Sequence, residues 1–219
     1  VSPFIGFRLP ATGALAFLLI RSCVFEHTQQ GINVSGNVDV VVSRSVFTDL
    51  GSEGSSMVQA GGAIGVHTTS SNTVSILKCV FVNNSISSDE GGGALGINEA
   101  SLIVRDSRFD ANTAFAMDDP LIGGLGGAIY VNGPASSVSI IGSHFDGNEA
   151  DNGGGAIFYN GTRLEISRSI FENSESIRAQ GGGAIFHFVA ADIFESSLLS
   201  IHSSRFTNSI AVGNGGAII

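Results

Sequence analysis

An eight-residue phrase ending in phenylalanine occurs seven times along the 219-residue chain, and no copy gains or loses a residue. The phenylalanines recur at intervals of 22 to 36 residues and are Phe25, Phe47, Phe81, Phe109, Phe145, Phe171 and Phe206. A second phrase, Gly-Gly-Ala-Ile or Gly-Gly-Ala-Leu, begins at Gly61, Gly92, Gly126, Gly154, Gly182 and Gly215. Such regular repetition is typical of a solenoid, in which each coil buries its apolar residues against the next coil.

Inside the phrase, aliphatic residues stand seven and five places before each phenylalanine, and serine or cysteine stands two places before it. Alternation with a period of two predicts a strand with one buried face. The inward-facing residues five and two places before the phenylalanine are three residues apart, which breaks this alternation. We therefore expect a bend between two short strands. The paired glycines permit a sharp corner. In the first two coils this phrase is degenerate, with Gly13–Leu15 and Gly31–Val34 in its place.

These patterns predict an all-β protein: a right-handed parallel β-helix, a solenoid of about seven coils, with residues 1–219 as a single domain. Like residues then stack on like at ~4.8 Å per coil, and the hand follows from the rule for parallel crossovers. A leucine-rich repeat would add a helical segment to each repeat, and a propeller blade needs about 40 residues or more. Because Gly215–Ile219 stop within a repeat, we expect a piece of a longer polypeptide.

The net charge of −9, with ten basic residues, argues against a nucleic-acid partner, which requires a basic surface. It argues equally against electrostatic docking on an anionic membrane. The longest apolar run, Ala14–Ile20, is far shorter than the ~20 residues of a spanning helix. We therefore expect no membrane span in this segment, and a core strand at this run.

Three of the phenylalanines begin the motif F-x-x-N, which places Asn84, Asn112 and Asn148 three residues later. Together with the six glycine phrases, the motif resembles the polymorphic outer-membrane protein repeats of chlamydiae. The resemblance implies a right-handed β-helix exposed outside the cell, often working in adhesion. We expect the three asparagines to form a structural ladder at a corner, since asparagine tolerates turn geometry and stacked amides bond one another. The ladder should be broken where other residues stand, at Thr28, Leu50, Ser174 and Ser209.

Right-handed β-helices also carry polysaccharide lyases and hydrolases, so acidic residues were considered as catalytic groups. The candidates are Asp89, Glu90, Asp118, Asp119, Glu149 and Asp151. We interpret them as solvated loop charges and predict no catalytic residue and no cofactor. A cluster of three acids and one base in a groove would favour the enzyme alternative. No zinc site is expected, because the histidines lack the spacing of metal ligands; they are His27, His67, His144, His187 and His202.

Cys23 and Cys79 both stand two places before a phenylalanine, two coils apart. Two coil steps span roughly 9–10 Å, whereas a disulfide tolerates about 7 Å between Cα atoms. The sequence therefore predicts two buried free thiols.

Candidate sites for sugar fall into two kinds. Acceptor motifs for N-glycosylation occur at Asn33, Asn83 and Asn160. Tyr130 and Tyr159 each follow a glycine phrase, one coil apart, and could together form a small stacking platform for a carbohydrate-binding module; we favour ordinary strand tyrosines, which are common in sheets.

We expect a non-enzymatic, extracellular structural β-helix of a cell-surface protein, acting as a rigid stalk, adhesin or filament subunit. Its expected partners are other surface or filament proteins, including copies of itself, and glycans. The alternatives are a polysaccharide lyase or hydrolase and a carbohydrate-binding module.

Overall fold

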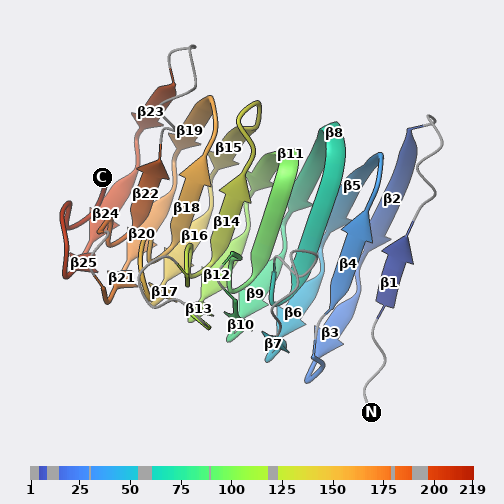
Figure 1. Ribbon diagram of the computed structural model, residues 1–219, viewed down its shortest axis with the longest axis horizontal. Coiled ribbons are helices and arrows are strands. Elements are labelled where there is room, and N and C mark those ends of the chain that lie inside the picture. The colour runs from blue at the N-terminus through green and yellow to red at the C-terminus, as the bar shows by residue number, and fades with distance from the viewer. Residues whose placement is uncertain are drawn as a thin grey trace.

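The computed structural model describes residues 5–8, 15–29, 31–53, 61–88, 90–117, 123–178, 181–188 and 197–219. In these ranges every strand pairing is parallel, and the strands form three sheets that run side by side along the molecule. Figure 1 shows the coils following one another from the N-terminal end to the C-terminal end of an elongated body. This arrangement confirms the predicted all-β parallel solenoid.

The largest sheet, here called the long sheet, has twelve strands. Its strands are β1 (Ile5–Arg8), β2 (Ala16–Arg21), β4 (Ile32–Ser35), β5 (Val38–Ser43), β8 (Ile64–Leu77), β11 (Leu95–Arg105), β14 (Ile129–Asn132), β15 (Ser137–Ile141), β18 (Ile157–Asn160), β19 (Arg163–Ser167), β22 (Ile185–Phe188) and β23 (Leu198–His202). Each coil enters this sheet with its glycine phrase and leaves it at the aliphatic part of the phenylalanine phrase. In the third and fourth coils both parts merge into one strand each, β8 and β11.

Two narrower sheets complete each coil. The phenylalanine sheet contains β3 (Val24–Glu26), β6 (Val46–Thr48), β9 (Val80–Val82), β12 (Arg108–Asp110), β16 (His144–Asp146), β20 (Ile170–Glu172) and β24 (Arg205–Thr207). The short sheet contains β7 (Gly51–Glu53), β10 (Ser85–Ser87), β13 (Thr113–Phe115), β17 (Glu149–Ala150), β21 (Glu175–Ser176) and β25 (Ile210–Ala211).

Single residues in left-handed backbone conformation form the corners on both sides of each phenylalanine. Three places before the ring, φ is positive at Ser22, Arg44, Lys78, Asp106, Gly142, Arg168 and Ser203. Two places after the ring, φ is positive at His27, Asp49, Asn83, Ala111, Gly147, Asn173 and Asn208. All fourteen φ values lie between 49° and 62°. The first corner is the predicted bend between the two short strands of the phrase.

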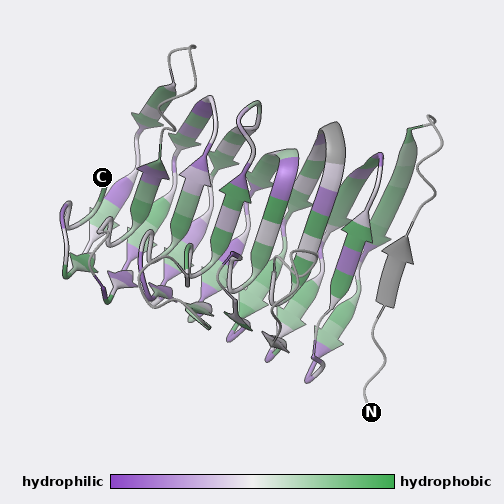
Figure 2. Cartoon of the chain, viewed as in Figure 1, coloured by the Kyte–Doolittle hydropathy of each residue, from purple (hydrophilic) through white to green (hydrophobic). Residues whose placement is uncertain are grey.

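The seven phenylalanine rings form one continuous stack inside the tube. Successive ring centroids lie 4.5 to 4.8 Å apart, and the ring planes differ by at most 7°. The rings of the second to sixth coils are fully buried beside columns of valine, isoleucine and leucine. Figure 2 shows these apolar residues as green bands at matching places on neighbouring strands. The solvent-excluded core is therefore a column rather than a globule.

In the five phrases that another coil follows, the second glycine faces that coil at very short range. A Cβ atom on Gly93 would lie 2.1 Å from the carbonyl oxygen of Gly127, and one on Gly127 would lie 2.0 Å from that of Gly155. The first glycine provides the unusual backbone angle in some coils, with φ of 70° at Gly126. Glycine is thus required by a corner, as predicted, and also by the close approach of backbones on neighbouring coils, which was not predicted.

Of the two segments expected to replace the glycine phrase in the first two coils, only one occupies its place. Gly31–Val34 does take the place of the glycine phrase, because Ile32 lies in register with Ile64. Gly13–Leu15 does not, since the residue in register with Ile32 in the first coil is Ile5 of β1; Gly13 and Ala14 themselves lie outside the described residues.

The apolar run near the N-terminus forms β2, as predicted, but only alternate residues face the core. Phe17 and Leu19 point outward and are 65% and 57% exposed. Among the described residues, the structure contains no helix that could span a bilayer.

Candidate functional site

The three motif asparagines form a buried column between the phenylalanine sheet and the short sheet. Asn84 Nδ2 donates to Asn112 Oδ1 at 2.9 Å, and Asn112 Nδ2 donates to Asn148 Oδ1 at 3.0 Å. Each Nδ2 also donates to the carbonyl oxygen of a phenylalanine in the preceding coil, and all three side chains are fully buried. These contacts hold neighbouring coils together and leave no amide free for a ligand.

The column ends where the motif ends. In the second coil Leu50 replaces the asparagine, and only its backbone N–H is bonded to the column, at 3.2 Å from Asn84 Oδ1. In the sixth coil Ser174 bonds locally to the carbonyl of Glu172, and Ser209 Oγ in the seventh coil is buried without a hydrogen-bond partner among the described residues.

A second polar column lies two places before the phenylalanines. Each serine hydroxyl there donates to a carbonyl two residues earlier, as Ser107 Oγ does to Arg105 at 2.8 Å. The same oxygen accepts the backbone N–H of the equivalent residue in the preceding coil, as Ser107 Oγ does from Cys79 at 3.1 Å. This pattern fixes the left-handed corner of one coil against its neighbour, so the serines are structural.

Both cysteines occupy this column and both are free thiols. Ser45 stands between them in register, which separates them by two coil steps. Burial raises the pKa of the Cys79 thiol, which makes it a poor nucleophile. Cys23 is only half-buried, contrary to the expectation of two buried thiols, because it lies in the first coil, where only the second coil packs against it.

Acidic residues converge with an arginine on the short sheet, and this is the strongest cluster of titratable groups among the described residues. Glu149 of β17 lies in register beside Glu175 of β21. Asp151, just after β17, accepts the backbone N–H of Ala116 at 2.9 Å and pairs with Arg178 Nη2 at 3.4 Å. The cluster therefore holds three acids and one base.

The carboxyl groups of this cluster differ in their environments. Burial raises the pKa of Glu149, and the charges of Glu175 and Asp151 raise it further. Asp151 is almost completely buried and is fixed by its two partners, which suits a residue that anchors the loop beside Ala116. The raised pKa makes Glu149 a candidate proton donor.

Glu149 and Asp151 were among the candidates predicted from the sequence, whereas Glu175 and Arg178 were not. The signal for Glu175 was present, because Glu149 and Glu175 each stand four places after a phenylalanine of adjacent coils. Of the other acidic candidates, Glu90 is exposed and belongs to no such group. Asp89, Asp118 and Asp119 lie outside the described residues.

The five histidines do not come together. His27 lies near Asp49, His144 lies 3.4 Å from Glu172, and His187 Nε2 lies 2.9 Å from Ser197 Oγ. His67 is half-buried in β8, and His202 is exposed beside Ser200. No group of three or more metal-ligating side chains occurs within the described ranges.

The two tyrosines lie in strands β14 and β18, as the favoured interpretation expected, and on opposite faces of the long sheet, so they do not form the shared platform of the carbohydrate-binding alternative. Tyr159 points into the core, where its hydroxyl donates to the Ser136 carbonyl at 2.8 Å and burial raises its pKa to about 12. Tyr130 points outward, and its register partner is Phe158 rather than Tyr159. The cause is a one-residue offset between the two sequence positions, which reverses the face of a strand.

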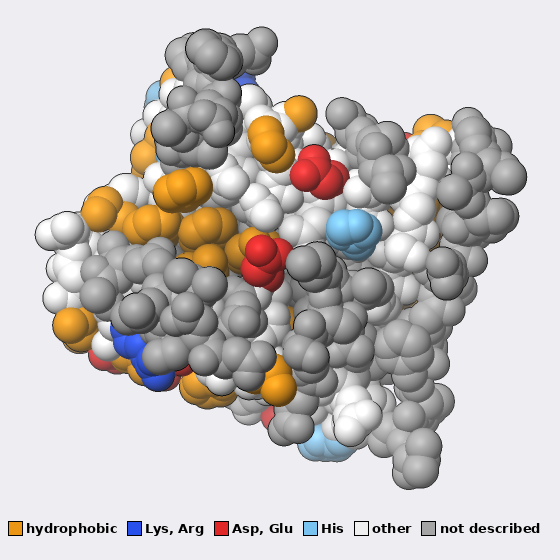
Figure 3. Space-filling view, viewed as in Figure 1, with side chains coloured by type: hydrophobic (Ala, Val, Ile, Leu, Met, Phe, Trp, Pro, Cys, Tyr) orange, Lys and Arg blue, Asp and Glu red, His pale blue; other side chains and the backbone are white. Residues whose placement is uncertain are grey.

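Tyr130 begins a second aromatic stack on the outside of the long sheet. Its ring lies 5.2 Å from that of Phe158, and Phe158 lies 5.6 Å from Phe186. Tyr130 and Phe158 pack with Leu125 and are nearly buried. Figure 3 shows apolar side chains gathered on this face over β18 and β22.

The three glycosylation motifs differ in accessibility. Asn83 is exposed at a left-handed corner, where its Nδ2 lies 3.3 Å from Asp49 Oδ1. Asn33 is half-buried in β4, and Asn160 is half-buried with its Nδ2 donating to Asn132 Oδ1 at 2.9 Å. Modification stays a prediction, and Asn83 is the most accessible acceptor of the three.

Comparison with known families assigns the architecture. Residues 11–219 match the family described as the right handed beta helix region, and the chain therefore belongs to that family. No curated protein and no solved structure matches the chain. The finer resemblance to chlamydial outer-membrane repeats stays a prediction.

Proposed function

We propose that this chain is the structural, non-enzymatic part of an extracellular cell-surface protein, a rigid rod that serves as stalk, adhesin or filament subunit. The observation that supports this function best is the unbroken stack of seven rings beside the buried asparagine column. The phenylalanine rings and the motif asparagines both make their contacts with neighbouring coils. The residues that recur most regularly therefore serve mechanical continuity rather than a local reaction.

The surface location is supported by the resemblance of the glycine and F-x-x-N phrases to outer-membrane repeats. The exposed acceptor at Asn83 is compatible with a glycoprotein. Partners in this proposal are other surface or filament proteins, copies of the same chain, and glycans.

Electron microscopy of the full-length native protein tests this role. Isolated rods projecting from a cell envelope would support a stalk or adhesin, and long fibres would support a filament subunit. Globular particles confined to the cell interior would contradict the proposal.

A second candidate function is polysaccharide cleavage, and the cluster of Glu149, Glu175, Asp151 and Arg178 favours it. A carboxyl group with a raised pKa next to other carboxylates is typical of glycosidases and lyases. The test is release of reducing ends or unsaturated products from polygalacturonate, with Glu149→Gln as the matched variant. Turnover that this variant abolishes would replace the structural proposal; absence of turnover would remove the enzyme candidate for this substrate.

A further inference from the structure

Basic side chains without a carboxylate partner gather at one corner of the helix. The structure describes nine arginine and lysine side chains, and four of them pair with carboxylates: Arg108, Arg163, Arg178 and Arg205. The other five have no ion pair within the described residues, and all stand three or four places before a phenylalanine: Arg21, Arg44, Lys78, Arg105 and Arg168. Their distribution is thus set by the repeat.

Four of these five lie on consecutive coils, from the first to the fourth. The position four places before the ring carries Arg21, Ser43, Leu77 and Arg105 in direct register. The next position, at the left-handed corner, carries Arg44 and Lys78 on neighbouring coils. Asp106 occupies that corner on the fourth coil, so the excess of positive charge lies on coils one to three. We call Arg21, Arg44, Lys78 and Arg105 the basic strip.

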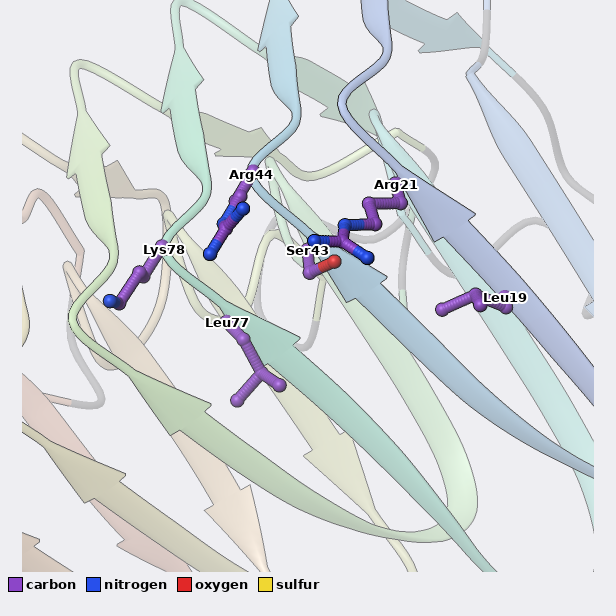
Figure 4. A pocket seen from close by; sticks show the side chains of 6 residues that line it. All are labelled: Leu19, Arg21, Ser43, Arg44, Leu77 and Lys78. Atoms are coloured by element: carbon purple, nitrogen blue, oxygen red, sulfur yellow. The ribbon is translucent and has the colours of Figure 1, made fainter.

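An open pocket of about 280 Å³ lies within this strip. It is lined by Leu19, Arg21, Ser43, Arg44, Leu77 and Lys78. Figure 4 shows that these six side chains come from three adjacent coils. The pocket therefore presents cations beside apolar side chains, and its lining spans three coils.

Like charges on adjacent coils repel one another, because the coil step is only 4.7 to 4.8 Å here. The protein has a net charge of −9, yet within the described residues Asp106, beside Arg105, is the only carboxylate at these corner positions of the first four coils, and none of the described carboxylates forms an ion pair with the strip. A bound anion would relieve the repulsion. Since the cations repeat with every coil, the best match is a ligand whose charges repeat at about the same ~4.8 Å interval along the helix axis.

We propose that the basic strip binds a linear acidic glycan, one that carries a sulfate or carboxylate on successive sugars. Arg21 and Arg44 supply planar guanidinium groups that bond such anions in pairs, and Lys78 supplies a point charge. Leu19 and Leu77 contact the C–H faces of the sugar rings. A flat anionic bilayer fits this corner less well, because the exposed Phe17 of β2 lies in register with the carboxylate-bearing Asp39. The site goes beyond the proposed mechanical role, since a stalk, an adhesin or a filament could each carry it.

Titration calorimetry of the 219-residue chain tests the site with heparin as the sulfated probe, polygalacturonate as the carboxylated probe and dextran as the uncharged control. The variant Arg21→Gln/Arg44→Gln/Lys78→Gln should bind the preferred acidic glycan at least about tenfold more weakly. The control Arg108→Gln/Arg163→Gln/Arg205→Gln removes the same charge from exposed, paired arginines elsewhere and should bind as the unaltered chain does. Circular dichroism establishes that both variants fold.

Preference between the two acidic probes distinguishes a sulfated from a carboxylated ligand. Absence of binding to either probe would overturn the proposal. Equal loss of binding in both triple variants would also overturn it, because attraction would then depend on net charge and not on the strip. Binding of single-stranded DNA as tight as that of the glycans would replace the glycan with a nucleic acid.

Discussion

At the scale of single residues, a buried amide holds three coils together. The Asn112 side chain donates to Phe81 O and Asn148 Oδ1, and its oxygen accepts both Nδ2–H and N–H of Asn84. Burying a polar group costs little free energy only while the group keeps its hydrogen-bond partners. Removal of the Asn112 side chain leaves polar groups on both neighbouring coils without a partner.

Asn112→Ala should therefore lower the free energy of unfolding by about 3 kcal/mol. Urea unfolding followed by circular dichroism measures the loss. Asn160→Ala is the control, because that half-buried amide has a single hydrogen bond to Asn132; its cost should stay near 1 kcal/mol. Equal costs for the two variants would contradict the role assigned to the column.

Glu149 makes stability depend on pH. Its pKa is raised above the ordinary value of 4.5 by burial and by neighbouring carboxylates, so its ionised form is less favourable in the folded protein than in the unfolded chain. Stability from this group is then highest when it is protonated, and it falls as pH rises through the raised pKa.

Glu149→Gln should accordingly raise the melting temperature at pH 7, and the gain should vanish as pH falls below about 4.5. Thermal melts across this range provide the measurement. Glu165→Gln, at an exposed glutamate paired with Arg163, should show no such gain. A melting temperature for Glu149→Gln that is unchanged at pH 7 would contradict the repulsion inferred between the stacked carboxylates.

At the scale of strands and corners, the glycine phrase sets how closely coils approach. A Cβ on Gly93 would meet the Gly127 carbonyl at 2.1 Å and the Thr113 backbone nitrogen at 2.5 Å. Thr113 begins the paired strand β13, and Gly127 lies in the bend before β14, where its N–H donates to the Gly154 carbonyl; neither backbone can move without breaking hydrogen bonds between coils.

Gly93→Ala should destabilise the protein by more than about 4 kcal/mol or prevent folding. Gly147→Ala provides the comparison, since nothing lies within 4 Å of its Cβ position and only its φ of 60° is unfavourable. That variant should cost about 1–2 kcal/mol and remain folded. Chemical denaturation measures the free energy of unfolding of both variants. Similar values for the two would contradict the role assigned to the close contact at Gly93.

The strands and their stacking could be predicted from sequence because each coil repeats the same local pattern. Register follows directly once every phenylalanine is placed above the last. The acidic cluster and the basic strip could not be predicted as easily, because their members recur at one position in only some coils, with different residues between. Tyr130 and Tyr159 show the remaining difficulty: both follow a glycine phrase, yet an offset of one residue sends them to opposite faces.

At the scale of the whole molecule, each coil is an interchangeable layer. Phe81 and Phe109 occupy equivalent places on adjacent coils, so removal of residues 82–109 joins Phe81 to Asp110 without a change of register. Stability in such proteins is approximately a sum of coil and interface contributions.

The deletion of residues 82–109 should leave a shorter, folded rod that unfolds cooperatively at a modestly lower temperature. Circular dichroism and small-angle scattering check the strand content and the length. Deletion of residues 82–95, about half a coil, should abolish folding, because it places unlike residues above one another. A folded half-coil deletion together with an unfolded whole-coil deletion would contradict the layer description.

In the two polar columns, the hydrogen bonds from backbone N–H groups to side-chain oxygens share one direction along the axis. In both polar columns, a backbone N–H of one coil is received by a side-chain oxygen of the following coil, as between Asn84 and Asn112 and between Cys79 and Ser107. These bonds make the rod directional, since each of them runs from one coil to the following coil. Two rods that continue the same columns across a junction must therefore be aligned head to tail.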